Sequence, residues 1–154
     1  MSTTATIEYP EPLYSLVDTS YEGLPMVLVV NSALCRFEHK EVFPWGLSVI
    51  IVAEDLAENG MPTRDESEVL TRVGDEIASV VLEGHNGLFA ARSTWNGERQ
   101  LLFRVHSAER ANSALQQLIA LGTQARAWEF QMEHDPAWSG VRYYLGLVGA
   151  SPNA

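Results

Sequence analysis

The sequence has little cysteine and no long hydrophobic run. Cys35 is the only cysteine among 154 residues, so no disulfide can form within the chain. The longest apolar stretches, such as residues 49–53, are far too short to cross a bilayer. The first twelve residues contain neither the basic segment nor the apolar segment of a secretion signal. We therefore expect a cytoplasmic protein of bacterial type that does not contact a membrane.

Positive charge is also scarce. Asp and Glu number 20 and Lys and Arg number 10, which gives a formal net charge of -10. Such an acidic surface repels phosphate backbones, so nucleic acid is an unfavourable partner. The excess of acid is most simply explained by solubility. The apolar fraction of 46% is ordinary for a globular protein, and the length fits one domain with its own core.

The signatures of common active sites are missing. The sequence contains no G-x-S-x-G, no G-x-x-x-x-G-K-[ST] and no G-x-G-x-x-G motif. His39, His85, His106 and His134 do not pair at the spacings of metal ligands, and Cys35 is not part of a C-x-x-C motif. The sequence therefore predicts no cofactor, no metal and no catalytic residue, and it favours a non-catalytic protein.

One adjacent pair, His134 and Asp135, could suggest an acid and a base. Neighbouring residues on an extended chain point to opposite faces, so the two do not form a dyad by themselves. We interpret Asp135 as a turn or capping residue before Pro136, with Trp138 packed against the core.

The clearest structural signal is a β-hairpin over residues 87–106. Asn96-Gly97 lies between two apolar-rich runs, and this dipeptide is typical of a type I′ turn because both central residues need positive φ. With that turn Trp95 opposes Glu98, and the register assigns every other residue to a face. One face is expected to meet the helices, with Arg92 and Arg99 reaching water near the turn; it comprises Leu88, Ala90, Arg92, Thr94, Arg99, Leu101, Phe103 and Val105. The other face is a mixture of apolar and polar residues, namely Phe89, Ala91, Ser93, Trp95, Glu98, Gln100, Leu102 and Arg104.

The remaining elements follow from hydrophobic periodicity and capping signals. Residues 26–34 and 45–54 are predicted strands, and residues 125–133 alternate like a half-buried strand. Thr63 and Glu66 have the spacing of a capping box before a helix that Gly84 ends. Ser107 begins a second helix that ends at Gly122. Residues 138–147 could form a short helix or strand.

This order predicts an α+β fold. Strand, helix, hairpin, helix and strand give the ferredoxin-like βαββαβ antiparallel sheet, with both helices on one face and an added N-terminal strand of undecided position. We divide the chain into an N-terminal arm (residues 1–24), a single α+β domain (residues 25–147) and a C-terminal tail (residues 148–154). The arm has no clear periodicity, but it is apolar enough that part of it should lie on the domain.

The mixed face of the hairpin is the candidate binding surface. Its residues with the most to offer a partner are Phe89, Trp95, Gln100, Leu102 and Arg104. RNA-recognition domains stack bases on such a sheet, but their basic and aromatic signature is missing here and the net charge is unfavourable. The N-terminal arm, the final segment or the second subunit of a homodimer is expected to cover this face.

The chain resembles the bacterial domain of unknown function 695 family. The resemblance lies in the strand pair at residues 26–34 and 45–54, the Asn96-Gly97 hairpin and two spaced motifs. The first is G-x-P-T-x-x-E-x-x-x-L (Gly60, Pro62, Thr63, Glu66, Leu70), and the second is D-P-x-W (Asp135, Pro136, Trp138) followed by Tyr143 and Tyr144. The family implies a fold but no activity. Its fold is similar to that of the regulator of ribonuclease activity B, an acidic protein that binds an enzyme, and this analogy does not establish function.

Two functional hypotheses remain open. The first is a non-catalytic interaction or regulatory protein that binds a protein partner through the mixed face or the acidic surface. The second is a small-molecule-binding domain or enzyme with a pocket between the sheet and the N-terminal arm, lined by Trp45, Trp138 and Arg104. A concave pocket with converging polar groups would favour the second hypothesis, and a flat or dimer-covered sheet the first.

Overall fold

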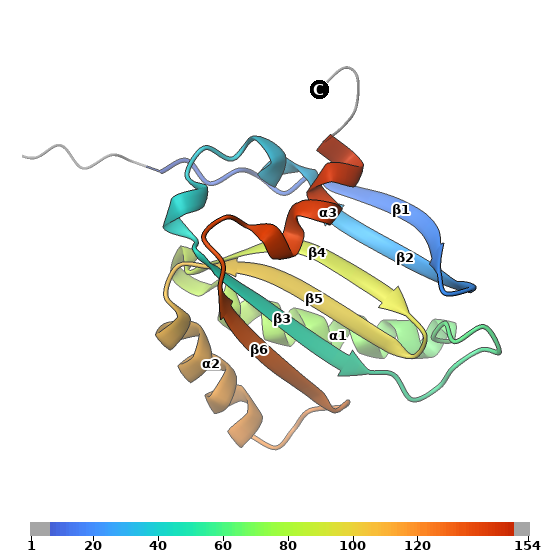
Figure 1. The fold of residues 1–154 in the computed structure, drawn as a ribbon. Helices are drawn as coiled ribbons and strands as arrows, with labels where there is room; N and C mark the ends of the chain where they lie inside the picture. Colours follow the sequence, from blue (N-terminus) through green and yellow to red (C-terminus); the bar gives the residue numbers. More distant parts are fainter. Residues whose placement is uncertain (1–6, 150–154) are drawn as a thin grey trace, which may run out of the picture.

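The computed structural model describes residues 7–149 and contains one six-stranded sheet with three α-helices (Figure 1). The strands are β1 (Tyr14–Tyr21), β2 (Leu24–Asn31), β3 (Trp45–Val52), β4 (Gly87–Trp95), β5 (Glu98–Val105) and β6 (Trp128–His134). The helices are α1 (Arg64–Val81), α2 (Ala108–Ala120) and α3 (Ser139–Gly149), and short 3-10 turns occupy Ser32–Arg36, Lys40–Val42 and Glu83–His85.

The sheet contains the predicted ferredoxin-like core. Its strand order is β1-β2-β4-β5-β3-β6, and every neighbouring pair is antiparallel. The segment β3-α1-β4-β5-α2-β6 supplies the βαββαβ unit, so the α+β, ferredoxin-like prediction is confirmed. The added N-terminal strand is β2, and it pairs with β4 at the edge of that unit.

The first strand, β1, is missing from the sequence prediction, which treated residues 1–24 as an arm. Most of β1 is exposed and none of its residues is fully buried, so it lacks the apolar–polar pattern of a strand with one buried face. It is held by backbone pairing to β2 and by a tight turn in which Glu22 (φ 52°) and Gly23 (φ 79°) both have positive φ. This is the turn chemistry of Asn96-Gly97, but Glu-Gly is a much weaker signal than Asn-Gly.

The helices lie on both faces of the sheet. Helices α1 and α2 share one face, as predicted, and Figure 1 shows α1 behind the sheet and α3 in front of it. Helix α3 is the segment that the sequence left as helix or strand, and it packs on β2 and β4. The largest hydrophobic cluster therefore lies between the sheet and α1–α2, and two smaller clusters lie beneath α3.

The hairpin register is confirmed near the turn and wrong further away. Trp95 opposes Glu98, and Asn96 (φ 45°) and Gly97 (φ 82°) have the positive φ of a type I′ turn. A β-bulge at Ala90 then inserts one extra residue into β4, so that Phe89 opposes Phe103. Phe89 thus lies on the helix side of the sheet, opposite to the predicted face.

The bulge also places Leu88 and Ala90 on the α3 side of the sheet, although they were predicted to face the helices α1 and α2. Leu88 opposes Arg104 and, with Ala90, packs into the cluster beneath α3 rather than against α1. A bulge cannot be recognised from alternation alone, because it consists of a break in that alternation.

Helix α1 begins where the sequence predicts, but only half of the predicted capping box forms. Thr63 Oγ1 accepts the backbone N–H of Glu66 at 3.3 Å. The Glu66 carboxylate is buried and accepts instead from the Glu54 backbone N–H at 2.8 Å and from the Arg126 guanidinium at 2.6 and 2.7 Å. The Arg126 hydrogen bond, helped by that backbone N–H, lowers the Glu66 pKa to about 2.

Candidate functional site

A concavity lies between α1 and the sheet, on the side of β2 and β4. We call it the helix-side cleft; its volume is about 500 Å³. It is lined by Tyr14, Val29, Leu70, Thr71, Gly74, Asp75, Ala78, Leu82, Phe89, Arg92, Arg99, Leu101 and Phe103. Most of these residues are apolar, and the two cations among them come from neighbouring strands.

The cleft exists because the sheet extends beyond the helix that covers it. Helix α1 packs on β4 and β5, whereas β1 and β2 continue the sheet at the edge away from β5 (Figure 1). Val29 pairs with Arg92, and Leu16 pairs with Val29, so these three residues lie side by side on the helix-side face. The strands added to the ferredoxin-like core therefore form one wall of the cleft.

Gly74 contributes to the opposite wall. It lies in the middle of α1, where glycine costs about 1 kcal/mol relative to alanine. A Cβ at this position would meet Leu101 at 3.6 Å, an ordinary contact distance. Packing therefore does not require a glycine here, and its absent side chain enlarges the cleft.

Arg99 is the unusual residue of the cleft because its charge is buried without a carboxylate. It is 5% exposed. Its Nε donates to Thr94 Oγ1 at 3.0 Å, and its terminal nitrogens donate to the hydroxyls of Thr71 and Ser67 at 3.2 and 3.4 Å. Within residues 7–149 no ion pair reaches Arg99. Burial, reinforced by the charge of Arg92, lowers the Arg99 pKa to about 10.

Arg92 is the second cation of the cleft. It lies on β4, two residues from the partner of Arg99, and is half-buried. Burial lowers its pKa, and the charge of Asp75 on α1 partly offsets that effect. No ion pair within 4 Å joins Arg92 to Asp75 or to another described carboxylate. The cleft therefore concentrates two positive charges against one acidic side chain.

The sequence expected Arg92 and Arg99 to reach water through their long stems. That expectation is wrong for Arg99, because Ser67 and Thr71 of α1 close over its guanidinium. The useful signal was present in the pattern, since Arg99 shares a face with Leu101 and Phe103, which were predicted to be core residues. An arginine on the core face of a strand is a candidate for burial, and buried cations need a partner.

The residues predicted for the mixed face do not form one site. Trp95 is half-buried, and its Nε1 donates to the Tyr21 carbonyl at 2.9 Å. Gln100 Nε2 donates to Ser48 Oγ at 2.8 Å. Leu102 is partly buried beneath α3, Arg104 is fully buried, and Phe89 lies on the opposite face in the helix-side cleft. Of the three candidates expected to cover this face, the final segment, which forms α3, covers part of it.

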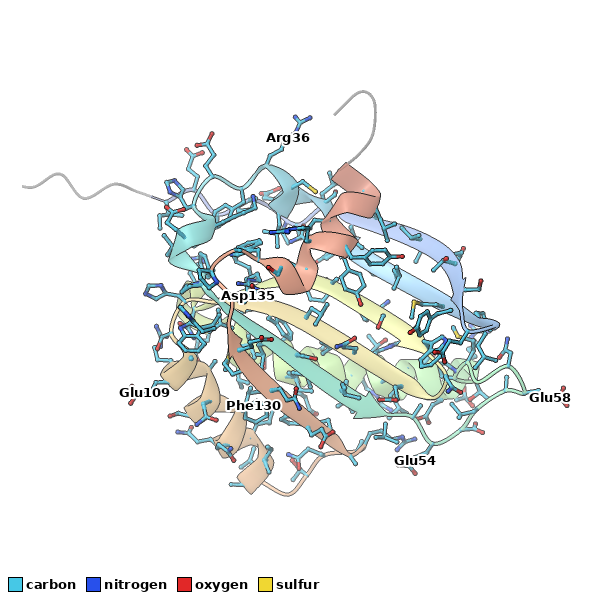
Figure 2. The ribbon with its side chains drawn as sticks, in the orientation of Figure 1. Arg36, Glu54, Glu58, Glu109, Phe130 and Asp135 are labelled. Atoms are coloured by element: carbon cyan, nitrogen blue, oxygen red, sulfur yellow. The ribbon has the colours of Figure 1, made fainter. Side chains whose placement is uncertain are left out.

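Arg104 has the partners that Arg99 lacks. Its guanidinium pairs with Asp135 Oδ2 at 3.0 Å and donates to the backbone carbonyls of Phe43 and Asp135. It also lies over the Trp138 ring at 4.9 Å. Figure 2 shows Asp135 at the point where the chain leaves β6 and enters α3. The turn role predicted for Asp135 is confirmed, since it accepts from the backbone N–H groups of Ser139 and Gly140.

A second groove, of about 490 Å³, lies next to this cluster on the α3 side of the sheet. It includes Leu102 and Arg104 together with Ser48, Gln131 and Glu133. Its only lining arginine is already neutralised by Asp135, and its other charged side chain, Glu133, is acidic. This groove therefore offers an anion no unsatisfied charge.

The pocket predicted from Trp45, Trp138 and Arg104 does not form. Trp138 and Arg104 are buried against each other, with exposed fractions of 3% and 0%. Trp45 opposes Val105 and packs with the cluster on the other side of the sheet. The number of tryptophans does not indicate on which face of the sheet each one lies. The sequence alone therefore could not show that Trp45 and Trp138 lie on opposite faces.

The described residues contain no group of three His, Cys, Asp or Glu side chains placed to hold a metal ion. Within the same part of the chain no helix is long and apolar enough to cross a membrane.

The comparisons with known proteins identify a family and nothing more specific. The model of a family of unknown function, DUF695, matches residues 15–145, which is most of the chain. No curated protein and no solved structure matches the chain. The similarity in fold to the regulator of ribonuclease activity B therefore stays a prediction.

Proposed function

The chain belongs to the DUF695 family, a family of unknown function, and we propose that it is a binding domain for a small anionic ligand. In this proposal the ligand lies in the helix-side cleft and pairs with Arg92 and Arg99. This is the small-molecule hypothesis, with a different pocket from the one the sequence suggested.

One observation carries the proposal: Arg99 is nine-tenths buried, and its partners within residues 7–149 are all hydroxyl groups. Removing a cation from water is costly, and proteins normally offset the cost with a paired carboxylate or a bound anion. The charge that acts on the Arg99 pKa, beside burial, is a second cation, Arg92. An anion in the cleft would supply the missing negative charge to both side chains.

The hydrogen-bonding capacity of Arg99 fits this role. A guanidinium has five N–H donors, and three of those of Arg99 have hydroxyl acceptors among the described residues. The three contacts fix the plane of the group in advance. Two N–H donors are left for a ligand oxygen, and a fixed guanidinium loses less entropy when it binds an anion.

Binding without catalysis is the better supported form of the proposal. The polar side chains that line the cleft are Tyr14, Thr71, Asp75, Arg92 and Arg99. They contain no histidine or cysteine, and the Thr71 hydroxyl donates to the Ser67 carbonyl rather than to a base, which a nucleophilic mechanism would need. A regulatory or carrier role, in which occupancy is the signal, follows from this composition. A protein partner on the mixed face has less support, because α3 covers Leu102 and Arg104.

The test is a thermal-shift and calorimetric titration with benzoate, inorganic phosphate and sulfate as probes. Wild type is compared with Arg92→Gln, which removes the more exposed cation, and with Arg72→Gln, a matched change at an exposed position of α1 outside the cleft. At about 100 times its Kd, a bound probe should raise the Tm of wild type and Arg72→Gln by roughly 5–10 °C. Arg92→Gln should lose most of that shift. If no probe stabilises wild type, or if Arg92→Gln responds as wild type does, the proposal is wrong.

A further inference from the structure

We infer that the ligand of the helix-side cleft is an amphipathic monocarboxylate, with its carboxylate on Arg92 and Arg99 and its apolar body against β1, β2 and the C-terminal half of α1. This inference rests on the proposed function and adds the chemical class of the ligand.

The charge of the cleft favours a single negative charge. Arg92 and Arg99 contribute two positive charges and Asp75 one negative charge, so the lining residues have a net charge of +1. The chain as a whole carries a formal charge of -10, which repels a polyanion more strongly than a monoanion. A carboxylate also matches the planar fork of a guanidinium, and one ligand of this kind neutralises the cleft.

The walls around the two arginines favour an apolar body. Val29, Ala78, Leu82 and Phe89 line the cleft on the side of β2 and the end of α1. Tyr14 stands beside them, with its ring 6.0 Å from that of Phe89 in an edge-on arrangement. A polar ligand body would leave these side chains without a complementary partner, whereas an aliphatic chain would remove them from water.

The apolar wall continues from Tyr14, which lines the cleft, to Leu16, which lies outside it. Leu16 pairs with Val29 and is 68% exposed, and Tyr14 on the same face of β1 is 60% exposed. Both side chains lie beyond the edge of the ferredoxin-like core, on the strands that form one wall of the cleft. Exposed large apolar residues that adjoin a charged pocket are typical of a site for a ligand with a polar head and an apolar tail.

The experiment is a calorimetric titration of the full chain with acetate, butanoate, hexanoate and octanoate. Each added methylene that enters the cleft should strengthen binding by about two- to fourfold. Heptyl phosphate, with the same seven-carbon tail and a larger charge, should bind at least tenfold more weakly than octanoate. Octanol, with eight carbons and no charge, should not compete with octanoate.

Two variants test the wall. Tyr14→Ser and Leu82→Ser change exposed residues of the cleft, so the fold should tolerate both. Each should flatten the dependence of affinity on chain length and leave acetate binding unchanged. Leu121→Ser, at an exposed position after α2, is the matched control and should behave as wild type.

The outcomes separate this inference from the proposed function. If acetate and octanoate bind equally well through Arg92, or if heptyl phosphate binds as tightly as octanoate, the amphipathic monocarboxylate is wrong and the anion site stands. If no carboxylate binds and the inorganic anions also fail, both proposals are wrong.

Discussion

Two buried arginines of the same strand, Arg99 and Arg104, show how differently one sheet can treat the same side chain. Arg104 faces α3, and its charge is neutralised by Asp135 at 3.0 Å. Arg99 faces α1, and its acceptors in the described part of the chain are all hydroxyl groups. Burial is the largest influence on both and lowers both pKa values, but for Arg104 the Asp135 carboxylate opposes the shift, whereas for Arg99 the neighbouring Arg92 reinforces it.

Burial alone therefore does not reveal what an arginine does. A buried cation with a carboxylate partner fastens elements together, as Arg104 joins β5 to the turn before α3, although its Nε has no hydrogen-bond partner among the described residues. A buried cation without a counter-charge has a cost that the protein's own contacts do not offset, and such groups concentrate at binding sites. The difference lies in the partners, and the partners come from other parts of the chain.

The largest loss of stability is expected when the Arg104–Asp135 ion pair is removed. Asp135→Ala leaves Arg104 buried without its counter-charge and removes the acceptor of the Ser139 and Gly140 N–H groups. We expect a loss of about 3–5 kcal/mol in the free energy of unfolding, measured by urea titration. Glu133→Ala, an exposed carboxylate on β6, should change stability by less than about 0.5 kcal/mol. A loss below about 1 kcal/mol for Asp135→Ala would show that Arg104 does not depend on this pair.

The ion pair of a third arginine, Arg126, can be tested by varying the pH. Arg126 pairs with the buried Glu66, whose pKa is lowered to about 2. A carboxyl group with a lowered folded-state pKa stabilises the protein above its unfolded value, here 4.5, and this stability is lost as pH falls from 4.5 towards 2.

Urea titrations across that pH range should therefore show a decline that is smaller in Glu66→Gln, because the variant cannot ionise at this position. Equal slopes for wild type and variant would contradict the pairing. Glu68→Gln, at an exposed position on the same helix, is the matched control and should keep the wild-type slope.

A smaller change in stability is expected when Arg99 is replaced. Arg99→Met keeps an unbranched side chain of similar length and removes a desolvated charge that has no carboxylate partner. We expect the free energy of unfolding to stay within about 1 kcal/mol of wild type, in contrast to Asp135→Ala. The same variant should lose the anion-dependent thermal shift. A loss of several kcal/mol without ligand would mean that the three hydroxyl contacts make Arg99 a structural residue.

The smallest effect sharpens the role of the cleft itself. Gly74→Ala should stabilise α1 by about 0.5–1 kcal/mol because alanine is the better helix former and Leu101 lies at an ordinary contact distance. The added methyl group reduces the space in the cleft beside Leu101, so ligand affinity should fall while stability rises. Thermal unfolding with and without octanoate measures both quantities. A more stable variant with unchanged affinity would show that Gly74 does not shape the site.

Much of the fold could be predicted because its signals are local. Thr63 and Ser107 begin helices where their side chains accept N–H groups of the first turn, and Asn96-Gly97 forms the expected hairpin turn. Strands β3 and β6 follow their apolar patterns. The prediction failed where local signals are weak or interrupted, as in the exposed strand β1 and at the bulge in β4.

The candidate site could be predicted only in part. The sequence places Arg92 and Arg99 on one face of the hairpin, and that assignment is correct. It gives no indication that Thr71 and Ser67 close over Arg99, that Phe89 crosses to the same face, or that β1 and β2 extend beyond α1. Each of these depends on contacts between residues that are far apart in the chain.

The ferredoxin-like order of elements, the hairpin register near its turn and the faces of the amphipathic strands follow from local sequence, since periodicity and turn chemistry act over a few neighbouring residues. Which of the two buried arginines is neutralised depends instead on the packing of the elements in space. Asp135 reaches Arg104 because α3 folds back over one face of the sheet, and among residues 7–149 no carboxylate forms an ion pair with Arg99 on the other face. Electrostatic pairing depends on distances in space, and these are fixed by the packing of the elements rather than by their order.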